Sequence, residues 1–147
     1  MSHASLTQRG AADGYLPPQD ELTAPWWDAT RERRLLLQHC GACGSVQHHP
    51  RYVCVSCGAA EALGWAESPG AGHVDTFTVV HRAPRPDLVV PYVIARIRLE
   101  EGPVLLSRVV AEDDAVSVVS IGDPVALDWS PLADGRALPV FRTVEVS

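Results

Sequence analysis

The sequence predicts a mainly β chain in which a short helix and a cysteine-rich metal module precede a small five-stranded barrel. Two observations carry this prediction. All four cysteines of the chain fall into two Cys-x-x-Cys pairs, and from residue 72 onward apolar residues recur at every second position, as in half-buried strands. With 147 residues, 46% of them hydrophobic, the chain can bury one modest core or two very small ones.

Charge and hydropathy narrow the function classes. The chain has 18 acidic and 12 basic residues, for a net charge of −6, and every basic residue is arginine. An acidic chain without a basic tail or helix is repelled by phosphate backbones, so we expect no nucleic-acid partner. The absence of lysine excludes Schiff-base chemistry. No apolar run approaches the ~20 residues that span a bilayer, and the first 22 residues lack the apolar stretch of a signal peptide. We therefore expect a cytoplasmic protein that makes no contact with a membrane.

The two Cys-x-x-Cys pairs predict a structural metal site. A tight turn between two cysteines aims both sulfurs at one point, and two such turns facing each other supply tetrahedral S₄ coordination. A glycine follows each pair and permits the positive φ that turns backbone N–H groups toward the thiolates. Because four thiolates fill every coordination position, no position is left for water, and the site is expected to be structural. The ligands are Cys40, Cys43, Cys54 and Cys57.

Other uses of these cysteines are less favoured. Disulfides are rare without secretion, a thioredoxin-type motif needs a single pair, and haem attachment needs a histidine after the second cysteine. Ligand softness favours one Zn²⁺ per chain, although iron also fits an S₄ site. Three histidines lie near the pairs, and with four cysteines available we expect none of them to be a ligand; they are His39, His48 and His49.

The first third of the chain divides into an arm, a helix and the metal module. Leu22, Trp26 and Ala29 are spaced as on one helix face, with Thr23 as the candidate N-cap and Pro25 in the first turn. The adjacent Trp26 and Trp27 either pack against the rest of the chain or meet a partner protein. The expected divisions are a flexible arm over 1–19, a helix over 20–33, a zinc ribbon over 34–66 and a barrel over 67–147.

Five strands are expected after the metal module, at 73–81, 91–99, 103–110, 125–129 and 138–146. In the first, Val74, Thr76, Thr78 and Val80 are expected to alternate with Asp75, Phe77 and Val79. The fourth and fifth are joined at Asp134-Gly135, which is a hairpin signal. A short helix or loop is expected over 115–120, where it could cap the barrel. Five strands, with a longer connection between the third and the fourth, indicate a small Greek-key barrel of the OB type.

The order of motifs resembles one known family. A Pro-Trp-Trp helix precedes Arg-Leu-Leu-Leu-Gln-His-Cys-Gly-Ala-Cys-Gly at 34–44, then His-Pro-Arg-Tyr at 49–52 and Cys-Val-Ser-Cys-Gly at 54–58. The barrel motifs follow at 72–80, 122–125 and 138–141. Over about 20–145 the chain resembles a bacterial and archaeal family that joins a rubredoxin-like zinc ribbon to an OB-fold, long filed as a domain of unknown function.

The resemblance implies an accessory role in acyl-CoA and lipid metabolism. Members accompany thiolase-fold proteins such as thiolases, steroid side-chain aldolases and acyltransferases, and act as scaffolding or substrate-channelling subunits. We therefore expect a hetero-oligomer with a thiolase-fold partner and no catalytic residues in this chain, with acyl-CoA at the shared interface. The alternative is a nucleic-acid-binding zinc-ribbon and OB-fold module, which the acidic charge disfavours. An independent enzyme is also disfavoured, because the sequence contains no nucleophile motif or open metal site.

Candidate contacts with a ligand or partner lie in two regions. Arginines suit the phosphates of CoA, and Arg82 and Arg85 follow the first barrel strand, in a loop of the kind that OB-folds use for ligands. The adjacent Trp26 and Trp27 are the candidate aromatic anchors. Arg96 and Arg98 share a strand face, where they either contact phosphates or form a solvated face paired with acids such as Glu100 or Glu112.

Overall fold

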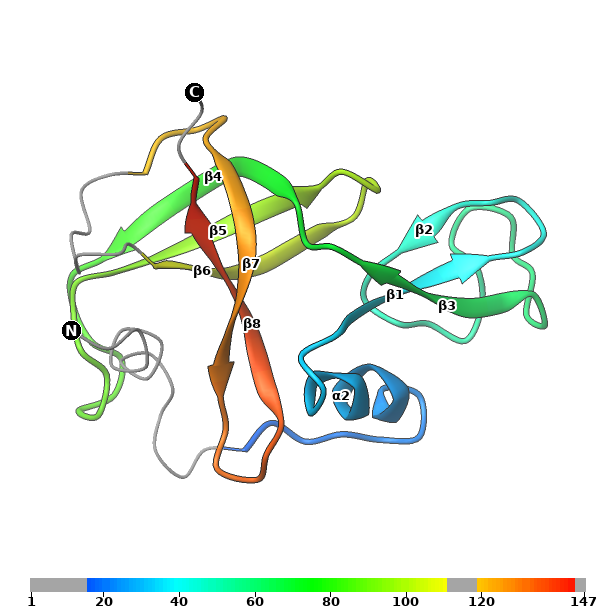
Figure 1. The fold of residues 1–147 in the computed structure, drawn as a ribbon, viewed down its shortest axis with the longest axis horizontal. Coiled ribbons are helices and arrows are strands. Elements are labelled where there is room, and N and C mark those ends of the chain that lie inside the picture. Colours follow the sequence, from blue (N-terminus) through cyan, green and yellow to red (C-terminus); the bar gives the residue numbers. More distant parts are fainter. Residues whose placement is uncertain (1–15, 111–118, 145–147) are drawn as a thin grey trace.

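The computed structural model describes residues 16–110 and 119–144. Figure 1 shows a ribbon of short strands projecting from one side of a barrel, with helix α2 in the angle between them. The sheets are a three-stranded sheet and a closed five-stranded barrel. The predicted class is confirmed: a mainly β chain with one short N-terminal helix, a zinc ribbon and an OB-like barrel.

Helix α2 (Ala24–Thr30) begins with a cap that differs from the expected one. Thr23 has helical φ and ψ, and its side chain caps no helix N–H. Asp20 does so instead, because its carboxylate accepts from the Thr23 N–H at 2.8 Å while the Thr23 hydroxyl accepts from the Asp20 N–H at 3.0 Å. This reciprocal pair is a capping box, so the cap lies three residues before the predicted one.

The ribbon is an antiparallel sheet in the order β2-β1-β3, formed by β1 (Leu35–Cys40), β2 (Val46–Gln47) and β3 (Leu63–Ser68). Strand β1 pairs with β3 along its whole length, from Leu35 opposite Ser68 to Cys40 opposite Leu63. The side chains of Leu35 and Leu37 are each only 1% exposed. The central strand therefore anchors the sheet in the core and ends at the first cysteine.

The barrel contains the five expected strands: β4 (Gly72–Val80), β5 (Tyr92–Leu99), β6 (Val104–Val110), β7 (Pro124–Pro131) and β8 (Ala137–Thr143). Their order around the barrel is β4-β5-β6-β8-β7, and β7 pairs with β4 to close it. Neighbouring strands are antiparallel except β6 and β8, which are parallel and share only two pairs, Val109 with Phe141 and Val110 with Arg142. The barrel is thus weakly paired at two places, at this β6–β8 seam and between β4 and β7, which also share only two pairs.

The predicted alternation in β4 is wrong beyond its third residue. A β-bulge between Val74 and Thr76 inserts an extra residue, so the side chains change faces there. Val74 is fully buried, but Phe77 and Val79, rather than Thr76 and Thr78, pack against the core farther along. The strand thus keeps an apolar inner face in spite of the broken period.

The barrel core is built mainly from β5, whose inward residues Val93, Ala95, Ile97 and Leu99 are each at most 2% exposed. From β8 the core receives Phe141, which is fully buried. Gly72 lies so close to β5 that a Cβ atom there would overlap the carbonyl oxygen of Arg98. A side chain at this position would push the two strands apart.

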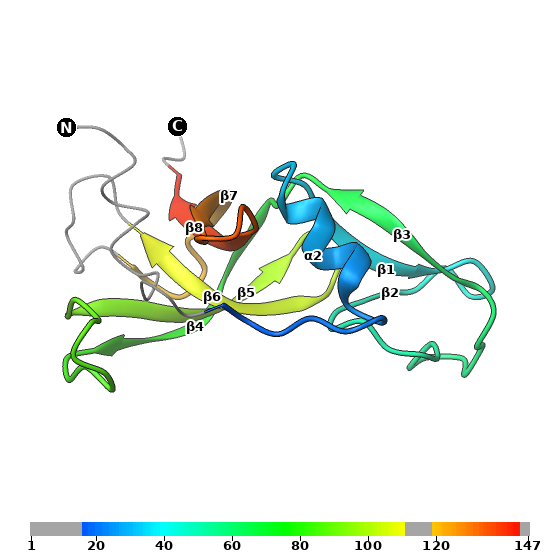
Figure 2. The same cartoon turned by 90° about the horizontal axis from the view of Figure 1, so that it is seen from below.

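Parts of three sequence predictions lie outside the described residues: most of the arm over 1–19, most of the segment 115–120, and the end of the last strand. Strand β8 ends at Thr143, and Val144 is exposed. Within 16–110 and 119–144, no helix has the length and apolar character needed to cross a membrane. Helix α2 contacts β1 of the ribbon and β8 of the barrel, and Figure 2 shows it beside both.

Candidate functional site

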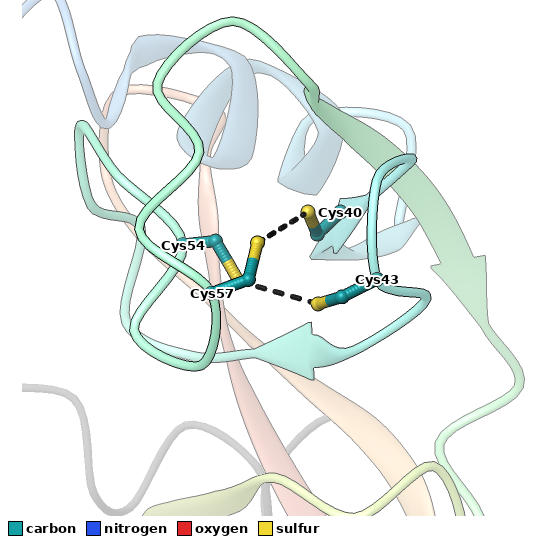
Figure 3. A group of neighbouring side chains, drawn as sticks. All are labelled: Cys40, Cys43, Cys54 and Cys57. Atoms are coloured by element: carbon teal, nitrogen blue, oxygen red, sulfur yellow. Dashed lines mark hydrogen bonds between the residues drawn. The ribbon is translucent and has the colours of Figure 1, made fainter.

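The four cysteines converge on one point between two loops of the ribbon (Figure 3). Their Sγ atoms all lie within 4.8 Å of one another. The Cys40 and Cys57 sulfurs are 3.7 Å apart, and those of Cys43 and Cys54 are 3.6 Å apart. A tetrahedral ion with metal–sulfur bonds of about 2.3 Å has sulfur–sulfur edges of about 3.8 Å. The donor set therefore fits one metal ion, as the sequence predicts.

The two halves of this centre have the same backbone geometry. The Gly44 N–H donates to the Cys40 carbonyl at 2.8 Å, and the Gly58 N–H donates to the Cys54 carbonyl at 2.8 Å. The two glycines have φ of 81° and 80°, while a Cβ atom at either would meet nothing within 4 Å. Glycine is therefore required here for its left-handed backbone conformation rather than for space.

Ser45 favours the thiolate form of two of the four cysteines, Cys43 and Cys54. Its hydroxyl lies 3.2 Å from the sulfurs of both Cys43 and Cys54, one from each loop. This hydrogen bond is the main cause that lowers the pKa of both thiols. Cys40 and Cys54 are buried, whereas Cys43 and Cys57 are exposed, so one side of the centre faces solvent.

Two buried glutamines hold the second cysteine loop, a feature that the sequence analysis did not find. Gln38 on β1 exchanges two hydrogen bonds with the backbone of Arg51, both at 2.8 Å. Gln47 on β2 accepts from the Val55 N–H at 2.9 Å and donates to the Val53 carbonyl at 3.2 Å. The amides also bond to each other, with Gln47 Nε2 2.7 Å from Gln38 Oε1. The only signal in the sequence was a glutamine two residues before the first cysteine and another before the histidines.

Next to the metal centre lies an apolar pocket of about 320 Å³, which falls at the lower end of the size range of ligand sites. It is bounded by α2, by the loop that leads from β2 to the second cysteine pair, and by β6 and β8 where they diverge beyond the β6–β8 seam. Across this gap the Ser107 hydroxyl donates to the Pro139 carbonyl at 2.6 Å. The lining residues include Trp26, Trp27, His48, His49, Pro50, Leu106, Arg108, Leu138 and Val140.

The two tryptophans predicted as contacts form one wall of this pocket. Their rings meet edge to face with centroids 4.7 Å apart, and Trp26 is 8% exposed. The guanidinium of Arg136 lies 4.8 Å from the Trp27 ring centroid, and this arginine is itself 4% exposed and paired with Asp134 at 2.7 Å. The Trp27 side chain thus packs from the helix against Arg136, next to the β7–β8 hairpin.

His48 and His49 do not join the cluster of sulfurs and lie in the pocket wall instead. Their rings are 4.3 Å apart, and the His48 ring is 5.7 Å from that of Trp26. Burial, with smaller contributions from His49 and Arg51, lowers the pKa of His48 from 6.5 to about 4. His48 is thus neutral at physiological pH and adds to the apolar character of the wall.

Arg82 and Arg85 lie away from the two tryptophans. Their loop joins β4 to β5 at the end of the barrel far from the ribbon (Figure 1), and neither residue lines the pocket. Both are exposed, and Arg85 Nε is 3.5 Å from Asp87 Oδ1.

Arg96 and Arg98 have partners other than the expected acids. The Arg96 side chain is 3.3 Å from Asp75, and Arg98 donates to the Gly102 carbonyl at 3.0 Å. Both lie on the exposed outer face of β5. Glu112, one of the two expected partners, lies outside the described residues.

Two family models match the chain. Residues 27–62 match the model described as the rubredoxin-like zinc ribbon domain of ChsH2, and residues 65–130 match the C-terminal OB-fold domain of ChsH2. Together they cover more than half of the chain and contain all four cysteines. The resemblance identified from the sequence motifs is confirmed, including the rubredoxin-like zinc ribbon.

Individual relatives support the same family. The chain is 38% identical over 119 residues to a probable enoyl-CoA hydratase alpha subunit of Thermomonospora curvata, a match that covers 80% of this chain and 36% of that protein. It is 34% identical over 94 residues to a DUF35 domain-containing scaffold protein of Methanocaldococcus jannaschii, covering 63% and 67%. A solved structure titled Ltp2-ChsH2(DUF35) aldolase superposes with a TM-score of 0.78 at 36% identity, covering 87% of this chain and 98% of that one. The chain thus spans about a third of the hydratase subunit but nearly all of the aldolase-associated chain.

Proposed function

Because this chain belongs to the DUF35 family, in which a ChsH2-type zinc ribbon is joined to an OB-fold, we propose that it is an accessory subunit of an acyl-CoA-processing enzyme complex. In this role it binds a thiolase-fold partner, which carries the reacting groups. The chain contributes a shaped surface beside the partner's active site and supports the partner's carbon–carbon bond chemistry by scaffolding or substrate channelling.

The closed metal centre is the observation that carries this proposal. The four sulfurs lie within 4.8 Å of one another and can supply all four positions of a tetrahedral ion, which would leave no open position for water or substrate. Zn²⁺ would be held by all four cysteines, and its contribution is to hold the two cysteine loops together. A centre of this kind maintains the shape of the ribbon and leaves the reaction to other residues.

The names of the relatives support the choice of partner. The superposed structure named as an aldolase supports a hetero-oligomer with an aldolase-type partner, and its match extends over 98% of that chain. A thiolase fold for that partner is the finer proposal. A hydratase subunit is the second candidate partner, because a relative is named as a hydratase alpha subunit. The match to that relative covers only 36% of its length, which favours the aldolase-type partner.

A surface suited to protein contact lies on the second cysteine loop. Tyr52, Val53 and Val55 are 72%, 44% and 67% exposed, so three side chains with large apolar parts lie at the surface of this short loop. Exposed apolar patches of this kind mark interaction sites. We assign this patch, Tyr52-Val53-Val55, to the partner interface, and Arg82 and Arg85 to contact with the phosphates of CoA.

A pull-down with the candidate thiolase-fold partner tests the proposal. The two proteins are expected to co-purify, and Val55→Asp is expected to weaken the complex at least tenfold because it places a charge in an apolar interface. The matched control is Ile121→Asp, since Ile121 is 69% exposed but lies in the barrel. Failure of the wild-type proteins to associate, or equal weakening by both variants, would contradict this assignment. The same pull-down with a hydratase partner separates the two candidates.

A further inference from the structure

Arg108 on β6 is a half-buried cation without an acidic partner. Its guanidinium lies over the ring of Tyr92, 4.5 Å from the centroid. Its Nε is buried and has no hydrogen-bond partner, and no carboxylate within residues 16–110 and 119–144 pairs with it. Burial lowers the pKa of Arg108, which shows that its surroundings penalise the charge, yet an arginine stays protonated. The positive charge of Arg108 is therefore balanced only in part, by the ring of Tyr92.

Three other arginines of the barrel have an acidic partner. Arg96 pairs with Asp75, Arg136 pairs with Asp134, and Arg142 pairs with a carboxylate on β7. The chain has more acidic than basic residues, so an acid beside Arg108 would be easy to supply. Partly desolvating a charge without an acidic partner costs free energy, and an oxygen acceptor on a bound molecule would offset that cost.

The surroundings of Arg108 indicate which kind of molecule could bind beside its guanidinium. Arg108 lines the pocket together with Leu106, Trp26 and Trp27, and the pocket surface is predominantly apolar. His48, whose ring lies 5.7 Å from that of Trp26, is neutral at physiological pH. The pocket thus offers one cation on an otherwise apolar wall, which fits an apolar body that ends in an oxygen acceptor.

We infer that this pocket binds an apolar acyl group and that Arg108 donates to its carboxylate or carbonyl oxygen. The inference deepens the proposed function and rests on it only for the source of the acyl group. That source is either a free carboxylic acid or an acyl thioester. The pocket is a concave, solvent-open site bounded by a helix, a loop and two strands of this one chain. This concave shape suits a small molecule better than the broad, flat contact of a protein partner.

The test uses the full zinc-loaded chain without a partner. The indole N–H resonances of Trp26 and Trp27, assigned with single Trp→Phe variants, report on pocket occupancy during titration with octanoate, octanol, octanoyl-CoA or CoA. Octanoate is expected to shift both resonances, and octanol to bind more weakly. Arg108→Gln is expected to weaken octanoate binding tenfold or more, which corresponds to the loss of a charge-assisted hydrogen bond, and to leave octanol binding unchanged.

Two further variants separate charge recognition from folding. Arg108→Lys retains a cation and is expected to keep most of the octanoate affinity. Arg96→Gln removes an exposed arginine on the same sheet and is expected to have no effect. Shifts with octanoyl-CoA but not with CoA identify a thioester as a source, whereas shifts with octanoate alone identify a free acid; both support the inference.

Two results would overturn the inference. They are the absence of shifts with octanoate and octanoyl-CoA at millimolar concentration, and equal octanoate affinity in Arg108→Gln and wild type. Because this titration contains no partner, its failure leaves the pull-down result intact, and the two proposals fail independently.

Discussion

The side-chain amide of Gln47 donates to Oε1 of Gln38 at 2.7 Å, and this buried pair joins the metal centre to the pocket. Through Gln38 the pair holds the backbone at Arg51, and through Gln47 it holds the backbone at Val55. The same loop carries Cys54 on one side and the pocket residues His48 to Pro50 on the other. The geometry of both sites therefore depends on one polar network.

Replacing Gln47 with alanine is expected to destabilise the ribbon. The change removes hydrogen bonds to Val53, Val55 and Gln38, and it leaves the Val53 carbonyl and the Val55 N–H without their side-chain partner. The expected loss is about 2–4 kcal/mol of unfolding free energy, with faster loss of zinc to a chelator. Denaturant titration and a chelator-competition time course measure these effects. The exposed Glu61→Ala in the same ribbon is the control, and similar values for both variants would show that the network contributes little.

Replacing Cys43 with serine is expected to release the metal and unfold the ribbon. A hydroxyl is a poor substitute for a thiolate ligand, and metal binding and folding are coupled in modules of this size. Elemental analysis of protein purified without chelators should give one zinc per wild-type chain and much less than one in the variant. Ser56→Ala, within the second Cys-x-x-Cys pair, should retain its zinc. Wild-type protein that contains neither zinc nor iron would contradict the assignment.

Protonation of His48 is expected to make the fold less stable in mild acid. The folded-state pKa is about 4 and the ordinary value is 6.5, so the unfolded chain takes up a proton first as the pH falls. The contribution of His48 is fully present above pH 6.5 and is lost as the pH falls toward 4. Between pH 7.5 and 5.5 the loss is about 1.4 kcal/mol.

Because the thiolates also respond to acid, the His48 effect is measured as a difference. His48→Phe should show a smaller decrease in unfolding free energy over pH 7.5 to 5.5 than wild type in parallel denaturant titrations. Equal pH dependence in the two proteins would mean that His48 is not held neutral by burial.

The metal centre and the barrel strands could be predicted because their signals are local. The spacing of Cys40, Cys43, Cys54 and Cys57 directly encodes two sulfur-bearing turns, and strict alternation in β5 directly encodes its buried face. In β4 the alternation misleads beyond Val74, because a bulge shifts the face of every later side chain, and nothing in the sequence marks where a bulge falls.

The pocket could not be predicted, because its walls come together only through tertiary structure. Trp26 comes from the helix, His48 from the ribbon and Arg108 from a strand that diverges from β8. The glutamine network was also hidden, since Gln38 and Gln47 look like ordinary polar residues flanking a metal loop. The cap at Asp20 was missed because Thr23 fits the same pattern three residues later.

A turnover assay of purified components is the most direct test of the central claim. Acyl-CoA carbon–carbon bond cleavage or formation is measured for the thiolase-fold partner alone, for this chain alone and for an equimolar mixture. The account predicts no turnover by this chain, low activity or low stability of the partner alone, and higher activity in the mixture that is lost with Val55→Asp. Full activity and stability of the partner alone, or turnover of acyl-CoA by this chain alone, would contradict the accessory role.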